Sequence, residues 1–359
     1  MPEGRGRRAV FGALITSLVV VVAAGGTVAA RWRAPSGTDV SLARVTPATA
    51  AAGHTARDAP TSTTVAPTVP TPTVPVPTAP AAFPRPPSPR FTVVPYTGLG
   101  TWLDVYDWSA TFNRPGRDAP AALPVDIDLM VDVGVQTLFL QASKHDSPDD
   151  ILEADRLLGL IHQAKARGLR VVAWYLPNLV DPATDLRRLL AIAELPVDGL
   201  AVDIESREVA DPAERSRRLV ELSTRLRGAL PGLTLGAIVL PPVVMEDVNP
   251  NYWPGHPWAE LAPLYDVWLP MNYWSFRRPD SGWRDGGRYT AENIDRVRAR
   301  LGLPDAVVHP IGGVADGTSV ADVDGMVARA RERGAIGGSV YDFRTTAPEL
   351  WPALAPFRS

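Results

Sequence analysis

Three features of the sequence together predict an α/β fold in which eight parallel strands close into a (β/α)₈ TIM barrel. Short apolar runs recur between Phe91 and Ser359, and amphipathic helical patterns separate them. Strands that alternate with helices pair in parallel through right-handed crossovers. The region spans about 270 residues, which is the usual size of one such barrel. No glycine-rich phosphate-binding motif follows the first strand, which disfavours an open dinucleotide-binding sheet.

The expected elements follow from these patterns in chain order. Residues 151–167 and 212–230 are amphipathic and predict two of the outer helices. Gly168 follows the first of them and Gly334 precedes the last strand, both as helix-terminating glycines. The expected strands are 100–108, 137–143, 170–176, 199–205, 234–240, 267–274, 306–311 and 337–343.

Two segments precede the barrel. Basic residues come before an uncharged apolar run at about 9–30, long enough for the ~20 residues that cross a bilayer. We expect residues 1–34 to form a cytoplasmic basic segment and a transmembrane signal-anchor helix, giving a single-pass membrane protein with its C-terminal domain outside the cytoplasm. A cleaved signal peptide remains an alternative and would give a secreted protein. Residues 35–90 are rich in Pro, Thr and Ala, which predicts a disordered linker before the domain at 91–359.

Composition excludes several classes of function. A net charge of −3 gives no electrostatic reason to expect a nucleic-acid partner. The absence of cysteine excludes disulfides, thiolate metal sites and a cysteine nucleophile. His145, His256 and His309 lack metal-ligand spacing, so we expect neither a metal nor another cofactor.

Residues 199–205 place two carboxylates on one strand face. Side chains along a strand alternate between its two faces, so Asp203 and Glu205 point toward the barrel axis. They lie at the C-terminal end of the strand, where active sites of this fold are found. The same alternation assigns further inward or strand-end residues: Trp102, Asp104, Trp108, Gln141, Met271, Tyr273, Val340 and Asp342.

Short motifs in these strands resemble two families. The run Asp-Gly-Leu-Ala-Val-Asp-Ile-Glu at 198–205 resembles the Asp-Gly-x-Asp-x-Asp-x-Glu signature of family 18 glycoside hydrolases, the chitinase-like barrels. Ala201 stands where that family has its first inner Asp. The run at 271–273 resembles the family's Met-x-Tyr motif, with Trp274 in place of the usual following Asp. Residues 104–108 resemble the Asp-Val-x-x-Trp of family 25 lysozymes, which also carry a late Asp comparable to Asp342.

The resemblance implies glycosidic bond cleavage, which needs a proton donor and stabilisation of a cationic centre. It implies that Glu205 is the general acid, with a pKa raised by burial and by its neighbour. Asp203 is implied to orient the substrate's own N-acetyl group for attack, and Tyr273 to hydrogen-bond that group. Asp104 is implied to position the sugar or support its charge. The candidate substrate-binding residues are Trp102, Asp107, Trp108, Gln141, Trp174, Asn272, Trp274 and Asp342.

The function expected is therefore a membrane-anchored extracytoplasmic glycosidase that acts on a polysaccharide or peptidoglycan-type glycan containing N-acetylhexosamine. A non-catalytic carbohydrate-binding barrel remains an alternative, favoured by Ala201 and Trp274, as does a structural cell-envelope barrel. For the two strand carboxylates, the alternative is an ion pair with Arg207 or Arg344. Because Ala201 removes one partner carboxyl, we also expect Asp203 to ionise more readily than in the chitinase-like pattern.

Overall fold

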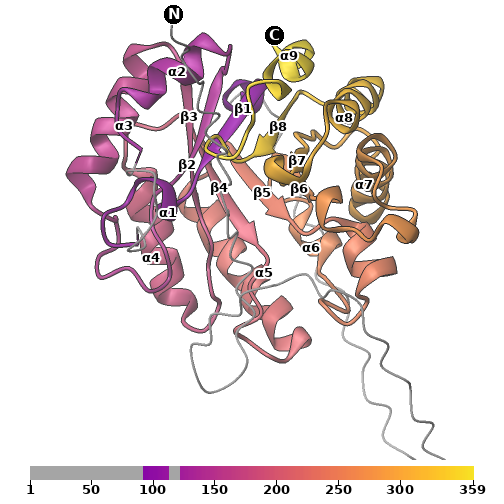
Figure 1. Cartoon of the computed structure of the whole chain (residues 1–359). Coiled ribbons are helices and arrows are strands. Elements are labelled where there is room, and N and C mark those ends of the chain that lie inside the picture. The colour runs from indigo at the N-terminus through magenta and orange to yellow at the C-terminus, as the bar shows by residue number, and fades with distance from the viewer. Residues whose placement is uncertain (1–91, 113–121) are drawn as a thin grey trace, which may run out of the picture. The chain divides into compact units, whose positions relative to one another are not determined.

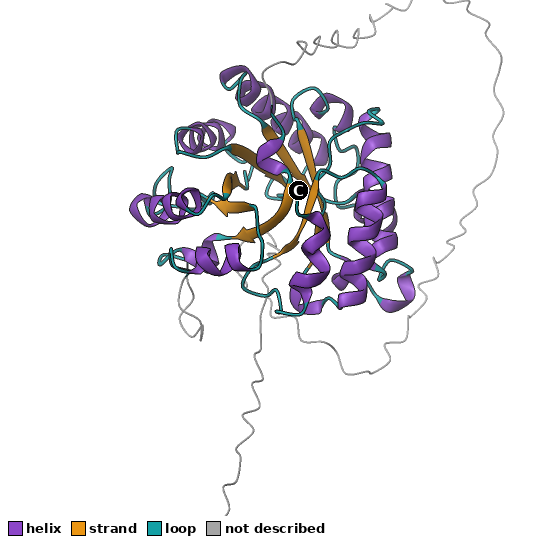
Figure 2. Ribbon diagram, turned by 90° about the horizontal axis from the view of Figure 1, so that it is seen from above, coloured by secondary structure: helices purple, strands orange, loops and turns teal. Residues whose placement is uncertain are grey.

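The computed structural model describes residues 92–112 and 122–359 and confirms the predicted barrel. Eight parallel strands pair in chain order, and the last pairs with the first (Figure 1). Helices surround the strands when the molecule is seen from above (Figure 2). The strands are β1 Gly98–Leu103, β2 Thr137–Gln141, β3 Arg170–Tyr175, β4 Gly199–Ile204, β5 Leu235–Val239, β6 Val267–Asn272, β7 Ile311–Gly313 and β8 Gly337–Tyr341.

The predicted N-terminal helix (9–30) and linker (35–90) lie outside the described residues. Within the described ranges, no helix has the length and apolar character needed to cross a membrane. The α-helices there are α1 Val105–Trp108, α2 Asp126–Asp132, α3 Ala154–Ala166, α4 Pro182–Ala193, α5 Pro212–Ala229, α6 Trp258–Leu261, α7 Gly286–Leu301, α8 Val320–Glu332 and α9 Leu350–Leu354.

Two expected strands differ from the observed ones. Residues 105–108 form α1 because Asp104 caps it: the Asp104 side chain accepts the N–H groups of Tyr106 and Asp107, and the Asp107 carboxylate accepts the N–H of Asp104. The seventh strand begins only at Ile311 instead of spanning 306–311. Pro310 precedes it and has no N–H to donate to a ladder.

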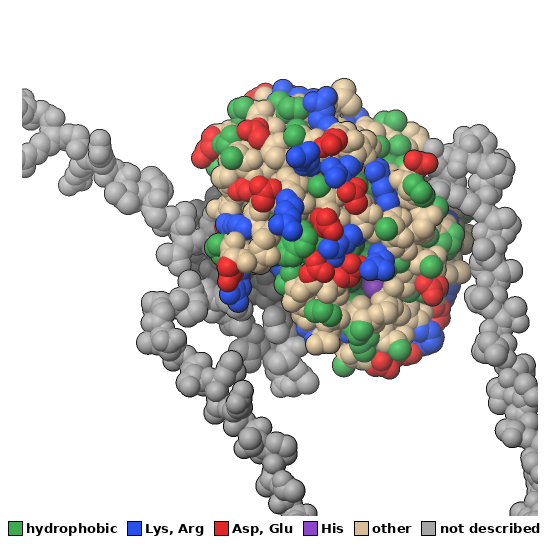
Figure 3. Space-filling model, turned by 90° about the vertical axis from the view of Figure 1, so that its right-hand side faces the viewer, with side chains coloured by type: hydrophobic (Ala, Val, Ile, Leu, Met, Phe, Trp, Pro, Cys, Tyr) green, Lys and Arg blue, Asp and Glu red, His purple; other side chains and the backbone are tan. Residues whose placement is uncertain are grey.

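Local sequence explains the outer helices. The buried side chains of α3 recur three or four residues apart, so one face packs on the barrel. Gly168 follows that helix with φ +81°, a conformation that favours glycine. Asp211 caps α5, and Pro212 occupies its first turn. The outward face over α7 and α8 carries interspersed basic and acidic side chains (Figure 3), as in the ion pair of Arg333 with Asp295.

Stacked side chains fill the barrel interior. Tyr96 closes the N-terminal end, where its hydroxyl donates to the carbonyl oxygen of Leu200 at 2.7 Å. Gly199 leaves room for that ring, since a Cβ there would lie 3.0 Å from it. Nearer the C-terminal strand ends, the ring of Trp102 stacks on Phe139 with centroids 4.2 Å apart. The barrel is therefore a packed core, and chemistry is confined to the C-terminal strand ends, called here the mouth.

Candidate active site

The mouth holds two carboxylates from the end of β4. Asp203 is 6% exposed, and Glu205 follows the strand and is partly exposed. One carboxylate oxygen of Asp203, Oδ1, is buried and has no hydrogen-bond partner among the described residues. No ion pair links Asp203 or Glu205 to a cation in those parts of the chain, so the predicted alternative with Arg207 or Arg344 is not observed.

Burial governs the protonation of this pair, which we call the β4 acid pair. Burial raises the pKa of Glu205 to about 7, so its carboxyl can hold a proton near neutral pH. Burial and the facing Glu205 charge raise the pKa of Asp203 well above its usual range. Desolvation therefore favours the protonated form of Asp203 even though Ala201 supplies no neighbouring carboxyl.

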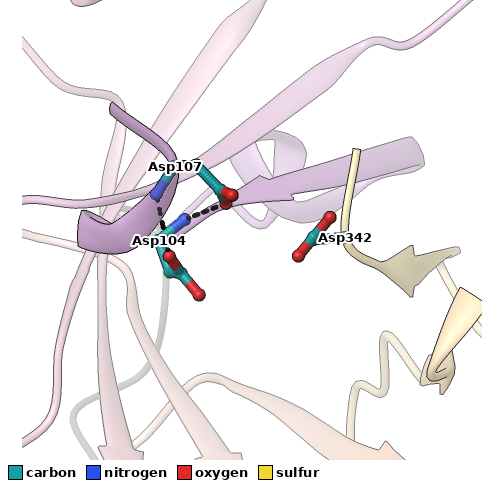
Figure 4. Close-up of side chains that lie close together, drawn as sticks. All are labelled: Asp104, Asp107 and Asp342. Atoms are coloured by element: carbon teal, nitrogen blue, oxygen red, sulfur yellow. Dashed lines mark hydrogen bonds between the residues drawn. The ribbon is translucent and has the colours of Figure 1, made fainter. Parts of the chain in front are cut away.

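A second acidic group joins the ends of β1 and β8. Asp104, Asp107 and Asp342 each place a carboxylate oxygen within 4.8 Å of the others (Figure 4). We call this group the β1–β8 acidic cluster. Backbone N–H groups bind oxygens of all three carboxylates and hold the cluster in this arrangement. Burial and the Asp104 charge raise the pKa of Asp342 to about 6.

Two tyrosines lie between the acidic groups. Tyr273, just past β6, and Tyr341, the last residue of β8, have ring centroids 6.0 Å apart. The Tyr341 hydroxyl donates to Oδ2 of Asp104 at 2.6 Å. Burial raises the pKa of Tyr273, and carboxylates of both acidic groups raise it further, led by Glu205 and Asp203. The structure therefore brings Glu205, Asp203, Asp104 and Tyr273 together at the mouth.

Strand alternation missed Tyr341 because it took Val340 and Asp342 as the inward residues of the last strand. The register shows otherwise, since Ser339 lies beside Gly100 and Ile311 on the inner face. Tyr341 shares that face and its ring lies 6.2 Å from Trp102. Asp342 reaches the cluster because it lies beyond the strand end, in a turn where its carboxylate accepts the N–H of Thr345.

The four tryptophans expected to bind sugar are all buried. Trp102 and Trp174 are 1% and 5% exposed and lie edge to face beneath the mouth. Trp108 is fully buried, and its indole N–H donates to the carbonyl oxygen of Gln141. Trp274 is fully buried against the outer side of Gly312. None presents a ring face to solvent, so their predicted stacking on sugars is wrong for this structure.

Two polar residues that were predicted to bind substrate make other contacts in the structure. The side-chain oxygen of Gln141 accepts the N–H of Val105 at 3.0 Å, so this residue holds α1 in place and is 5% exposed. Asn272 has no exposed surface, and it lies beside Gly312 on the strand face away from the axis. Gln141 thus supports the Asp104 turn, while Asn272 cannot reach a substrate at the mouth.

Two loop aromatics at the mouth were not predicted. The Tyr252 hydroxyl donates to the carbonyl oxygen of Glu205 at 3.0 Å. Phe276 is 47% exposed, and its ring meets Tyr273 edge to face with centroids 6.0 Å apart. Both lie beyond strand ends, where period-two alternation carries no information.

Comparison with known proteins places the fold. No family model and no curated protein sequence matches the chain. The spore cortex-lytic enzyme SleL of Bacillus cereus matches with a TM-score of 0.53 at 11% identity, over 73% of this chain and 74% of that one. A class V chitinase from Pseudomonas fluorescens gives 0.52 at 12% identity, over 73% and 99%. A family 18 chitinase from Cycas revoluta in complex with (GlcNAc)4 gives 0.53 at 11% identity, over 72% and 99%.

These identities are low, so the similarity establishes the fold alone. The described domain is a (β/α)₈ barrel of the kind found in family 18 glycoside hydrolases, in agreement with the resemblance seen in the β4 signature.

Proposed function

We propose that this protein is a glycoside hydrolase that cleaves a glycan containing N-acetylhexosamine, with Glu205 as the general acid. The β4 acid pair carries the proposal: a carboxyl at the mouth of the barrel, with a pKa of about 7, is a proton donor at neutral pH. The fold neighbours support it, since they include chitinases and a cortex-lytic enzyme.

The chemistry needs a second group beside the acid. As Glu205 protonates the leaving oxygen, positive charge develops at the anomeric carbon. Asp203 lies two residues away on the same strand face, which is unsuited to attack from the opposite side. It orients the substrate's acetamido group, whose oxygen attacks the anomeric carbon, and Tyr273 hydrogen-bonds that group. Ionised Glu205 then takes a proton from the water that opens the cyclic intermediate.

The proposed location is the outer side of a membrane. The basic residues before the apolar run 9–30 favour a cytoplasmic N-terminus, and the segment 35–90 would act as a stalk. Fractionation of cells that produce the full chain tests this: recovery with the membrane supports an anchor, and recovery in the medium supports a cleaved signal peptide.

A carbohydrate-binding barrel without activity is the second candidate. Ala201 favours it, because the chitinase-like signature has an Asp at that position and Ala201 is fully buried with no polar group to offer.

The deciding experiment measures product masses after the full chain is incubated with chitin oligomers, peptidoglycan and neutral polysaccharides. The parent is compared with Glu205→Gln and with the control Glu208→Gln, an exposed glutamate three residues later. We expect cleavage that falls ~10²–10⁴-fold in Glu205→Gln and persists in the control. Binding without cleavage would favour the second candidate, and neither binding nor cleavage would contradict both.

A further inference from the structure

Arg207 is an exposed cation in the loop after β4, close in sequence to the proposed acid. It follows Glu205 by two residues in the chain, and its side chain is exposed. Its guanidinium carbon lies 4.9 Å from the centre of the Tyr252 ring, a cation–π contact. Nowhere in residues 92–112 and 122–359 does a carboxylate form an ion pair with Arg207.

Hydrogen bonds to two loops fix the position of Tyr252, whose ring contacts Arg207. The Tyr252 hydroxyl donates to the carbonyl oxygen of Glu205 at 3.0 Å. Arg215 is 2% exposed and donates to the carbonyl oxygens of Val209 and Tyr252 at 2.9 and 3.1 Å. The loops after β4 and β5 are therefore braced together, and the Tyr252 ring that carries Arg207 is fixed relative to the acid.

The charges around Arg207 leave its guanidinium available. Arg215 is a like charge, and it is already bonded to backbone carbonyls. Glu205 owes its raised pKa to burial, so Arg207 does not act as its counter-ion. A guanidinium is a planar fork of N–H donors that matches the two oxygens of a carboxylate or a phosphate.

We propose that Arg207 binds an oxyanion, a carboxylate or phosphate substituent, on the glycan at the mouth. The preferred substrate is then an anionic glycan rather than neutral chitin. This inference rests on the proposed function for the presence of a glycan at the mouth, but its test uses binding and does not depend on cleavage.

The test is calorimetric titration of the full chain carrying Glu205→Gln, which prevents turnover. The probes are chitin tetramer, the same tetramer carboxylated at C6 and the same tetramer phosphorylated at C6. We expect an anionic tetramer to bind about five- to tenfold more tightly than the neutral one. Adding Arg207→Met removes the preference, whereas Arg331→Met, an exposed arginine on α8, retains it.

The outcomes separate the two proposals. Equal affinity for neutral and anionic tetramers, no binding of either, or a preference that survives Arg207→Met overturns the inference. The stronger of the two anionic ligands identifies the substituent as carboxylate or phosphate. A preference lost in Arg207→Met, in a protein that cleaves nothing, keeps the anion site and rejects the glycosidase. Glycan cleavage by the parent, without a preference for the anionic tetramers, would keep the glycosidase and reject the anion site.

Discussion

The two acidic groups at the mouth differ in the hydrogen bonds that their carboxylates accept. In the β4 acid pair, a buried oxygen of Asp203 has no partner among the described residues. In the β1–β8 acidic cluster, Asp104 accepts the N–H groups of Tyr106 and Asp107 and the hydroxyl of Tyr341. Both groups belong to one barrel mouth, so the fold itself does not impose either environment.

The difference separates two tasks. Donors around a carboxylate fix its geometry and stabilise its charge, as at Asp104. Desolvation favours the protonated form of a carboxyl, as at Glu205, and destabilises the folded protein when that proton leaves. The cluster is thus suited to positioning, and the pair is suited to proton transfer.

The largest expected effect concerns the pH dependence of stability. The pKa of Glu205 rises from 4.5 to about 7 on folding, so between these pH values the folded protein holds a proton that the unfolded chain has lost. The contribution of Glu205 to the free energy of unfolding should therefore decrease by roughly 3 kcal/mol across this window, at ~1.4 kcal/mol per pH unit. Urea unfolding at several pH values measures it. In Glu205→Gln the decrease should be smaller by that amount, and an identical pH dependence in parent and variant would contradict the environment described for the pair.

A smaller effect is expected when a third carboxyl enters the pair. Ala201 is fully buried between Trp174 and Gly236 in the strand register. Ala201→Asp should lower the free energy of unfolding by about 2 kcal/mol, since it places a carboxyl at a fully buried position. The loss should grow as the pH rises, because ionising the new carboxyl adds repulsion. Ala201→Asn is the matched control. An equal, pH-independent loss of unfolding free energy in both variants would show that the volume of the new side chain, rather than its charge, causes the loss.

The smallest expected effect tests the cluster as a positioning device. Tyr341→Phe removes the hydroxyl that donates to Asp104 at 2.6 Å. We expect kcat/KM to fall about tenfold, equivalent to ~1.4 kcal/mol, because Asp104 loses a donor that holds its carboxylate in position. Tyr289→Phe is the control, since that hydroxyl has no partner among the described residues. Similar losses in the two variants would reduce the role of Tyr341 to packing.

Local patterns were sufficient to predict the barrel and the β4 acid pair. Most strands have a hydrophobic run of their own, and alternation along β4 assigned Asp203 to the inner face. Alternation failed at Trp108, because the first strand ends early and the Asp104 side chain caps α1 there. It also chose the wrong face of β8. The residues Gly-Gly-Ser at the start of that strand do not distinguish an inner from an outer face, and the pairing of β8 with β1 determines which side chains point inward.

The tryptophans show a second limit of prediction from sequence. An aromatic residue on the inner face can either close the core or face a ligand, and sequence alone does not give its depth. Trp102 stacks on Phe139 and donates to Ser339, both contributed by other strands. Such contacts depend on how far each strand is shifted against the next, which is a property of the whole closed sheet.

The hydrogen bonds that Arg215 makes to two loops affect the thermodynamics of ligand binding. Its bonds to Val209 and Tyr252 join the loops after β4 and β5 before any ligand arrives. A substrate then meets a surface whose backbone is already ordered. Each side chain that binding does not need to immobilise spares about 0.5–1.5 kcal/mol of entropy loss. A short oligosaccharide with few contacts can therefore bind to this mouth with less opposition from conformational entropy than it would meet between independent loops.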